Sequence, residues 1–168
     1  MRNKAFYEDV ELNHLSRCRK KYWMFYALRK EQVASRRIAA RFWALMKKII
    51  LCGTGCEIPS CAISSKGGIR IPHLNGIIVN DHAKIGEGCT LFHQVTIGIK
   101  EAEGIRAPII GKNVLIGAGA KVIGPICVGD GVRIGANSVV TKDVPAFSTV
   151  VGINRVTFRE RPAKIVCR

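Results

Sequence analysis

His73 is the residue whose type and setting best fit a chemical role among the four histidines of the chain. It lies in the segment IPHLNG, residues 71–76, between a proline and an Asn-Gly turn signal. Imidazole titrates near neutral pH, so His73 is a candidate general base that accepts a proton from a hydroxyl group. A carboxylate that holds the other ring nitrogen would help such a base, and Glu57, sixteen residues upstream, is the candidate.

The other histidines are weaker candidates for catalysis. His14 falls in a region expected to be helical and solvated, and His82 is expected on an exposed face. His93 follows the apolar pair Leu91-Phe92, and we expect it in the cleft that receives the substrate. The sequence therefore assigns the base to His73 and a binding role to His93.

A six-residue repeat between Ile110 and Pro145 is the element that must position these side chains. A period of six fits neither an amphipathic helix nor a half-buried strand, and it is typical of a parallel β-helix, in which each block forms one face of a triangular coil. We call the aliphatic residue that begins each block its opener. The glycine after four of the openers suits a corner, because glycine enters backbone regions closed to other residues. The openers are Ile110, Ile116, Val122, Val128, Ile134 and Val140, and a small or aliphatic residue recurs four places after each, at Val114, Ala120, Ile126, Val132, Ser138 and Val144.

Two irregularities in the repeat indicate where a site would lie. A second run of openers starts at Val79, and His73 occupies the opener position six residues earlier, where the pattern asks for an aliphatic residue. Local rules are most often broken at functional sites. Thirteen residues separate Ile97 from Ile110, one more than two blocks, so the polar segment 98–109 is expected to leave the coil as a functional loop.

The composition divides the chain into three regions. Residues 3–50 contain neither proline nor glycine and predict two helices, the second over 31–50, with a break that Asn13 or Ser16 would cap. The repeat fades after Pro145. We therefore predict a basic helical segment over 1–52, a β-helix domain over 53–153 and a basic C-terminal tail over 154–168.

The net charge of +15 is concentrated near the N-terminus, where residues 1–50 hold 13 Lys or Arg against 4 Asp or Glu. Such an excess points to an anionic partner: nucleic acid, a membrane surface, or a phosphorylated cofactor or substrate. An apolar stripe over 42–50, bordered by basic residues, would pack on the coil or a neighbouring subunit, or lie on an anionic membrane. No apolar run is long enough to span a bilayer, and no nucleic-acid-binding motif is present. We expect a cytoplasmic protein, at most in contact with the inner face of the membrane, and no nucleic acid as partner.

The segments PHLNGIIV, LFHQVTIG, IRAPIIG, VLIGAGAKVIG and GANSVVTKDVP together resemble the left-handed β-helix acyltransferases with hexapeptide repeats. The sequence is most similar to their serine acetyltransferase branch, including its short relatives in exopolysaccharide gene clusters, and the resemblance covers roughly residues 55–153. It implies an all-β solenoid, a left-handed parallel β-helix with an N-terminal α-helical segment. It also implies a homotrimer with active sites between adjacent coils, acetyl-CoA as the donor, and no metal.

The resemblance also implies roles for individual residues. His73 would deprotonate an acceptor hydroxyl that attacks the thioester directly, and backbone N–H groups near Asn75 and Gly76 would hold the oxyanion. The positions that match the CoA contacts of the family are Gly98, Ala118, Ala136, Thr141 and Lys142, and Arg159 matches a phosphate-binding arginine of related sugar acetyltransferases.

The chain departs from the serine acetyltransferase branch at acceptor-binding positions. Pro72 replaces an aspartate that precedes the catalytic histidine, and Ala107 replaces a histidine in the loop. Arg106 could still meet an acceptor carboxylate, but members of that branch carry a much longer helical domain with a further serine-contacting aspartate, and most of their amino-acid recognition set is not matched in this sequence. The expected acceptor is therefore a sugar hydroxyl, free or lipid-linked, in exopolysaccharide or capsule biosynthesis, and L-serine, as in cysteine biosynthesis, is the alternative.

Two other classes of protein share features with this sequence. A zinc carbonic anhydrase shares this coil type but requires three histidines, two of them with four residues between them. His73, His82 and His93 are nine and eleven residues apart, which does not fit. A non-enzymatic basic adaptor would use the positive charge, but the coil has no basic patch with interleaved aromatic residues.

Overall fold

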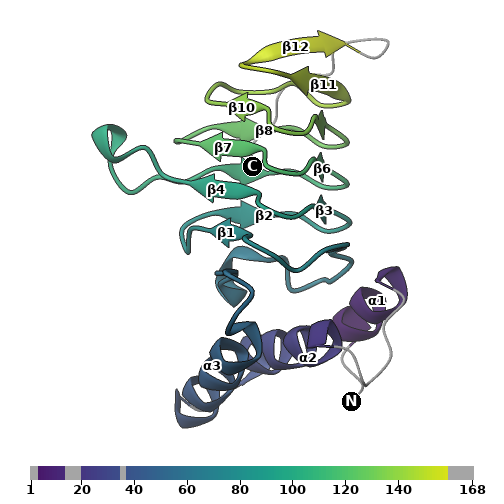
Figure 1. The fold of residues 1–168 in the computed structure, drawn as a ribbon, viewed down its shortest axis with the longest axis vertical. Helices are drawn as coiled ribbons and strands as arrows, with labels where there is room; N and C mark the ends of the chain where they lie inside the picture. The colour runs from purple at the N-terminus through teal and green to yellow at the C-terminus, as the bar shows by residue number, and fades with distance from the viewer. Residues whose placement is uncertain (1–3, 14–19, 35–36, 159–168) are drawn as a thin grey trace.

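The computed structural model describes residues 4–13, 20–34 and 37–158. It shows three helices followed by a parallel β-helix whose short strands form three sheets (Figure 1). The helices lie at the N-terminal end of the solenoid, and the coils stack away from them towards the last strand (Figure 1). The predicted fold, a parallel β-helix with an N-terminal helical segment, is confirmed.

Each regular coil contributes one short strand to each sheet, and equivalent residues are eighteen positions apart, as in the pairs of Ile78 with Thr96 and Leu115 with Arg133. Every predicted opener is buried, and so is the residue four places later, because both point into the prism. Their stacked side chains form the hydrophobic core. The first sheet holds β1 (Ile78–Val79), β4 (Thr96–Gly98), β7 (Lys121–Ile123) and β10 (Val139–Val140); the second holds β3 (Thr90–Leu91), β6 (Leu115–Ile116), β9 (Arg133–Ile134), β11 (Ser148–Val151) and β12 (Arg155–Phe158); the third holds β2 (Lys84–Ile85), β5 (Ile109–Ile110) and β8 (Cys127–Val128).

The glycines that follow the openers are required for a different reason from the predicted one. None of them has a positive φ. Instead, neighbouring coils approach so closely that a Cβ atom on Gly117 would lie 2.6 Å from the backbone nitrogen of Ala136. The left-handed conformations fall on other corner residues, such as Asn113 and Asn137, each with φ 54°, and asparagine tolerates this region better than most residues.

The loop predicted over 98–109 is present. Thr96 pairs with Lys121, twenty-five positions later, so seven residues more than a regular coil lie between them. The extra segment leaves the solenoid after β4, contains a short 3₁₀ turn (Glu101–Glu103) and projects sideways from the coil (Figure 1).

Three helices cover the first coil: α1 (Lys4–Leu12), α2 (Lys20–Val33) and α3 (Arg37–Leu51). The prediction of one helix over 31–50 is wrong, because α2 ends at Val33 and α3 begins at Arg37. The predicted break at Asn13 is present, and Ser16 lies outside the described residues. The Asn13 amide donates hydrogen bonds to the carbonyl oxygens of Asp9 (2.8 Å) and Ile69 (2.9 Å), so it both ends α1 and attaches it to the coil.

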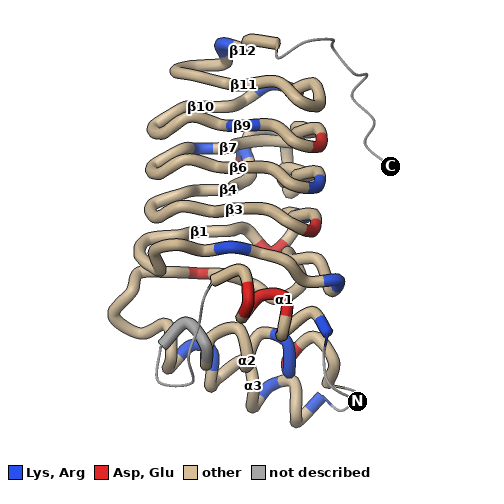
Figure 2. The backbone as a smooth tube through the Cα atoms, turned by 90° about the vertical axis from the view of Figure 1, so that its right-hand side faces the viewer, with Lys and Arg blue, Asp and Glu red and all other residues tan. Residues whose placement is uncertain are grey.

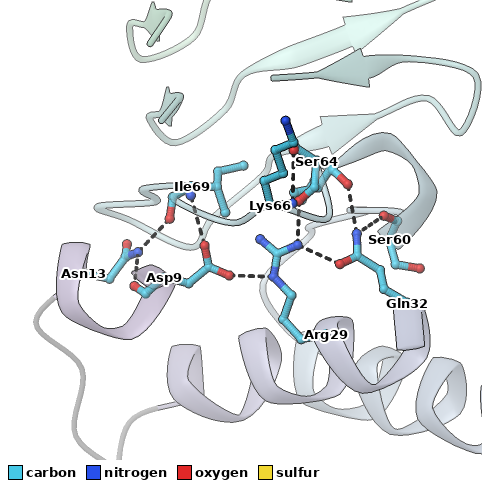
Figure 3. A network of polar contacts seen from close by, with 9 residues as sticks. Asp9, Asn13, Arg29, Gln32, Ser60, Ser64, Lys66 and Ile69 are labelled. Carbon is cyan, nitrogen blue, oxygen red and sulfur yellow. Dashed lines mark hydrogen bonds and ion pairs between the residues drawn. The ribbon is translucent and has the colours of Figure 1, made fainter. Parts of the chain in front are cut away.

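A buried polar network fastens the helices to the coil (Figure 3). The guanidinium of Arg29 donates to Asp9 Oδ2 at 2.8 Å, and the two side chains are only 2 % and 0 % exposed. Arg29 also donates to Gln32 Oε1 and to the Ser64 carbonyl, each at 2.6 Å. The backbone N–H of Ile69 donates to Asp9 Oδ1 at 2.9 Å. Burial raises the pKa of the Asp9 carboxyl, and the charge of Arg29 opposes that shift.

The far end of the solenoid is covered by β12, which pairs antiparallel with β11. An added strand of this kind satisfies backbone groups that the last coil would otherwise expose. The division of the chain at residues 52 and 153 remains a prediction. In the structure α3 ends at Leu51, and β12 reaches Phe158.

Candidate active site

His73 lies on a bulge at a corner of the first coil. Ile78 lies eight positions after Arg70, whereas their strand partners in the next coil, Thr96 and Thr90, are six positions apart. The corner of the first coil therefore contains two additional residues. Ile71 points into the core and is fully buried, and His73 is exposed. The prediction that His73 itself occupies an opener position is wrong, because the bulge gives that position to Ile71 and moves the imidazole to the surface.

The ring of His73 meets the ring of His93 from the next coil. Their centroids are 5.6 Å apart and their planes are inclined by 81°, an edge-to-face contact. His93 is half-buried, and its Nδ1 atom is buried without a hydrogen-bond partner among the described residues. Buried polar atoms normally have a partner, so a molecule bound beside His73 is a candidate to supply one.

A column of equivalent corner residues rises from this pair. In each coil, the backbone N–H of the residue after the corner donates a hydrogen bond of 2.8–2.9 Å. The acceptor is the backbone carbonyl of the corner residue in the preceding coil. The corner residues joined in this way are Asn75, His93, Ala118 and Ala136, which we call the His93 column. Two of the predicted CoA contacts, Ala118 and Ala136, therefore share a corner with the histidine pair.

The other predicted CoA contacts lie at the opposite end of the same strands. Gly98 ends β4, and Thr141 directly follows β10, so the two residues belong to a second column beyond the sheet. The Asn154 amide donates to the Thr141 hydroxyl at 2.8 Å, and Lys142 beside it is exposed. The strands of the first sheet separate this column from the His93 column, and Arg159 lies outside the described residues.

The predicted oxyanion donors differ in their availability. The backbone N–H of Gly76 donates to the Thr54 carbonyl at 2.8 Å, so this N–H already has a hydrogen-bond partner, and its role as an oxyanion donor stays a prediction. The side chain of Gln94 lies over this glycine, since a Cβ atom there would meet Gln94 Cγ at 3.3 Å. Asn75 is exposed at the same corner, and it remains the candidate donor.

Glu57 lies on the neighbouring strand segment, where it forms a parallel bridge with Ile78. Its exposed side chain borders a groove between the end of α3 and the first coils, lined also by Leu51 and Asp81. Within the described part of the chain, no hydrogen bond or ion pair joins Glu57 to His73. Its role as the carboxylate that orients the base stays a prediction.

Two residues beside the His93 column were not singled out from the sequence. Lys121 donates from its ammonium group to the Gln94 carbonyl (2.9 Å) and to the Thr96 hydroxyl (3.0 Å), which places a positive charge next to the corner. Gln94 has φ 58°, an uncommon conformation for a residue other than glycine. The sequence indicates the position of Lys121 only in that this residue directly precedes an opener and is therefore expected to point outward.

The predicted acceptor-binding residue Arg106 is exposed in the loop over 98–109.

No group of three or more His, Cys, Asp or Glu side chains in residues 4–13, 20–34 and 37–158 is arranged to hold a metal ion. The site that the structure does define is an open corner with two imidazoles, an exposed amide and a nearby ammonium group. Such a set can remove a proton from a hydroxyl and stabilise negative charge that develops beside it.

Comparison with known proteins shows what this coil is similar to. The model of the bacterial transferase hexapeptide family (six repeats) matches residues 107–142. A serine acetyltransferase of Helicobacter pylori (strain J99) is 46% identical over 106 residues, which are 62% of this chain and 61% of that protein. Soybean serine acetyltransferase complexed with serine superposes with a TM-score of 0.74 at 29% identity, covering 96% of this chain and 68% of that one. A serine acetyltransferase in complex with CoA has a TM-score of 0.69 at 28% identity, covering 83% and 57% of the two chains.

These relatives correct the expected acceptor. The chain spans about three fifths of the length of the H. pylori protein, and a match of 106 residues in a chain of 168 necessarily includes His73 and His93. The expectation of a sugar acceptor is wrong, because the proteins that match this coil are serine acetyltransferases, and the departures at Pro72 and Ala107 do not outweigh that identity. By its repeat, its sequence relatives and its fold, the chain is similar to the hexapeptide-repeat acyltransferases, and the relatives named above are serine acetyltransferases.

Proposed function

We propose that the chain is a serine O-acetyltransferase, which moves the acetyl group of acetyl-CoA to the hydroxyl of L-serine. The observation that carries the proposal is the exposed imidazole of His73, in contact with His93, within a coil that is 46% identical to a serine acetyltransferase. Proteins similar to the chain have been solved with serine and with CoA, which supports the choice of both substrates.

The proposed reaction is a direct transfer. His73 takes the proton of the serine hydroxyl, and the oxygen forms a bond to the carbonyl carbon of the thioester. The carbon–sulfur bond then breaks, and the CoA sulfur leaves with a proton returned by the imidazolium of His73. The products are O-acetylserine and CoA, and no group of the protein is acylated.

Groups beside the base would hold the two substrates in register. The exposed amide of Asn75 would donate to the carbonyl oxygen as negative charge develops on it. The serine carboxylate needs a cation, and both Lys121 at the corner and Arg106 in the loop are candidates. His93 would contact the acceptor through its buried Nδ1 atom, which has no partner among the described residues.

The donor site is proposed to lie between two protomers of a homotrimer. The small side chains of Ala118 and Ala136 let the pantetheine arm approach the backbone along the His93 column. Gly98, Thr141 and Lys142 lie on the second column, beyond the sheet, so one extended arm does not follow both columns of one chain. With prisms side by side, the second column of one protomer would face the His93 column of the next.

The experiment that tests the proposal offers the purified protein acetyl-CoA with a panel of acceptors. The panel contains L-serine, D-serine, L-threonine, L-homoserine and free or nucleotide-linked sugars, and both CoA release and the acetylated product are measured. We expect L-serine to give the highest kcat/KM and O-acetylserine as the product. Absence of serine-dependent CoA release, or a rate at least about tenfold higher with another acceptor, would overturn the assignment.

A further inference from the structure

Helix α3 carries an exposed apolar stripe. Its members follow one another at intervals of four, three and four residues, so they share one face of the helix. Their exposed fractions are large for aliphatic and aromatic side chains. The stripe consists of Ile38 (84 % exposed), Phe42 (52 %), Leu45 (55 %) and Ile49 (57 %).

Basic residues border this stripe along one edge. Arg37, Arg41 and Lys48 are exposed, and each precedes a member of the stripe by one position. Helix α3 contains no acidic residue. Its remaining cation, Lys47, is buried and paired with Glu31 of α2 at 2.7 Å, on the packed side of the helix. Figure 2 shows lysines and arginines along the helices at the N-terminal end of the solenoid.

Aromatic side chains continue the stripe onto α2. A chain of edge-to-face contacts links Trp23, Tyr26, Trp43 and Phe42, with centroids 5.9, 5.5 and 5.2 Å apart. Trp23 and Phe42, at its two ends, are 48 % and 52 % exposed. Indole and tyrosine rings are favoured where an apolar layer meets water, as at the headgroup level of a bilayer.

We propose that α3 docks in the plane of an anionic phospholipid surface, with its stripe among the acyl chains and its basic edge among the headgroups. Charge selects this occupant, because the exposed cations along the edge of the stripe complement anionic headgroups, and α3 carries no acidic residue that would be repelled by them. None of the described helices is long and apolar enough to cross a membrane, so the contact would be parallel to the surface. The proposal does not depend on the reaction at His73.

Vesicle flotation of the full chain tests the proposal. The probes are vesicles of phosphatidylcholine alone and vesicles with about one third phosphatidylglycerol. We expect the wild type to float with the anionic vesicles, with binding at least about tenfold weaker to the neutral ones and weakened by salt.

A double variant and a matched control assign the contact to the stripe. Phe42→Glu combined with Leu45→Glu should reduce binding at least about tenfold, whereas Phe158→Glu, at an exposed apolar residue (57 % exposed) of the far strand β12, should bind like the wild type. Far-ultraviolet circular dichroism confirms that each variant is folded. Equal binding to both vesicle types, or unchanged binding of the double variant, overturns the proposal. It is also overturned if the double variant lowers the oligomer mass while the wild type binds no vesicle, because α3 then covers a second copy.

Discussion

The rings of His73 and His93 meet edge to face at the corner where two extra residues enter the first coil. The bulge exposes the imidazole of His73, and the coil above supplies the second imidazole from a position that alanine occupies in the next two coils. A regular corner would have pointed the first ring into the core. At the scale of residues, the site is therefore made by an interruption of the repeat.

The first prediction concerns His93. Its Nδ1 atom is buried and has no partner among the described residues, so we expect it to bind the acceptor. His93→Ala should lower kcat/KM for serine by about 10- to 100-fold, the worth of one buried hydrogen bond to a charged group. His93→Gln, which keeps a donor and an acceptor, should recover part of the loss. Wild-type kinetics in His93→Ala would exclude the contact.

The second prediction concerns Cys89, which is fully buried in the core. Burial raises the pKa of its thiol to about 11. Because the folded pKa is raised, the stability that the neutral thiol contributes is complete below the ordinary thiol pKa and is lost as the pH rises towards about 11. At pH 8, iodoacetamide should alkylate the exposed Cys61 and spare Cys89, and denaturant should make both reactive. Equal labelling of the two thiols in the native protein would contradict the inward position of Cys89.

At the scale of elements, the helices are held to the coil by polar contacts between distant parts of the chain. Asp9 accepts hydrogen bonds from Arg29 of the next helix and from the backbone of Ile69, sixty residues away (Figure 3). Both charged side chains are buried, so each depends on the other. This network holds α1 and α2 on the end of the solenoid, and α3 packs against α2.

The third prediction tests this network by removing one charge and then both. Asp9→Ala leaves the Arg29 guanidinium buried without its carboxylate and should lower the free energy of unfolding by about 3–5 kcal/mol. Asp9→Ala combined with Arg29→Met should be more stable than the single variant, because no unpaired charge remains. Chemical denaturation measures both. Glu8→Ala, which breaks the exposed Lys4–Glu8 pair, is the control and should change little. A single variant as stable as this control would contradict the network.

The fourth prediction concerns the close approach of coils at the glycines after the openers. A Cβ atom at Gly117 would lie 2.6 Å from the Ala136 nitrogen, so Gly117→Ala must push two coils apart. We expect a loss of about 1–3 kcal/mol in the free energy of unfolding. Gly98→Ala is the matched control, because its Cβ would meet no backbone atom within 4 Å, only the ends of the Ile123 and Thr96 side chains, at 3.4 and 4.0 Å. Equal stability of the two variants in denaturant titrations would contradict this account of the glycines.

At the scale of the whole molecule, the features that follow the six-residue repeat could be predicted from the sequence, whereas the contacts between segments far apart in the chain could not. The openers and the loop over 98–109 follow from local periodicity, and the structure buries those openers and extrudes that loop. The bulge at His73 could not be predicted, because it is defined by pairing with the coil above. The Asp9–Arg29 network could not be predicted either, because its partners lie far apart in the sequence. The same holds for the hydrogen bond from the Gly76 N–H to the Thr54 carbonyl.

The proposed assembly follows from the two columns on opposite ends of one sheet. A donor site that contains residues of both columns requires a second protomer beside the first. We therefore expect a particle of three chains, each of 18.4 kDa. In such a trimer the helices of all three protomers would lie at the same end. The proposed membrane contact would then be made at three points, away from the His93 columns.

The fifth prediction is also the most direct test of the central claim, that His73 is the base for acetyl transfer to serine. CoA release from acetyl-CoA with saturating L-serine is compared for the wild type, His73→Ala and His82→Ala, with the particle mass of each measured. His82 is an exposed histidine of the same region, 3.7 Å from Asp81, and serves as the control. We expect His73→Ala to lower kcat by about 10²–10⁴ without a change of mass, and His82→Ala to match the wild type. If His73→Ala retains serine-dependent turnover within about threefold of the wild type, His73 is not the base.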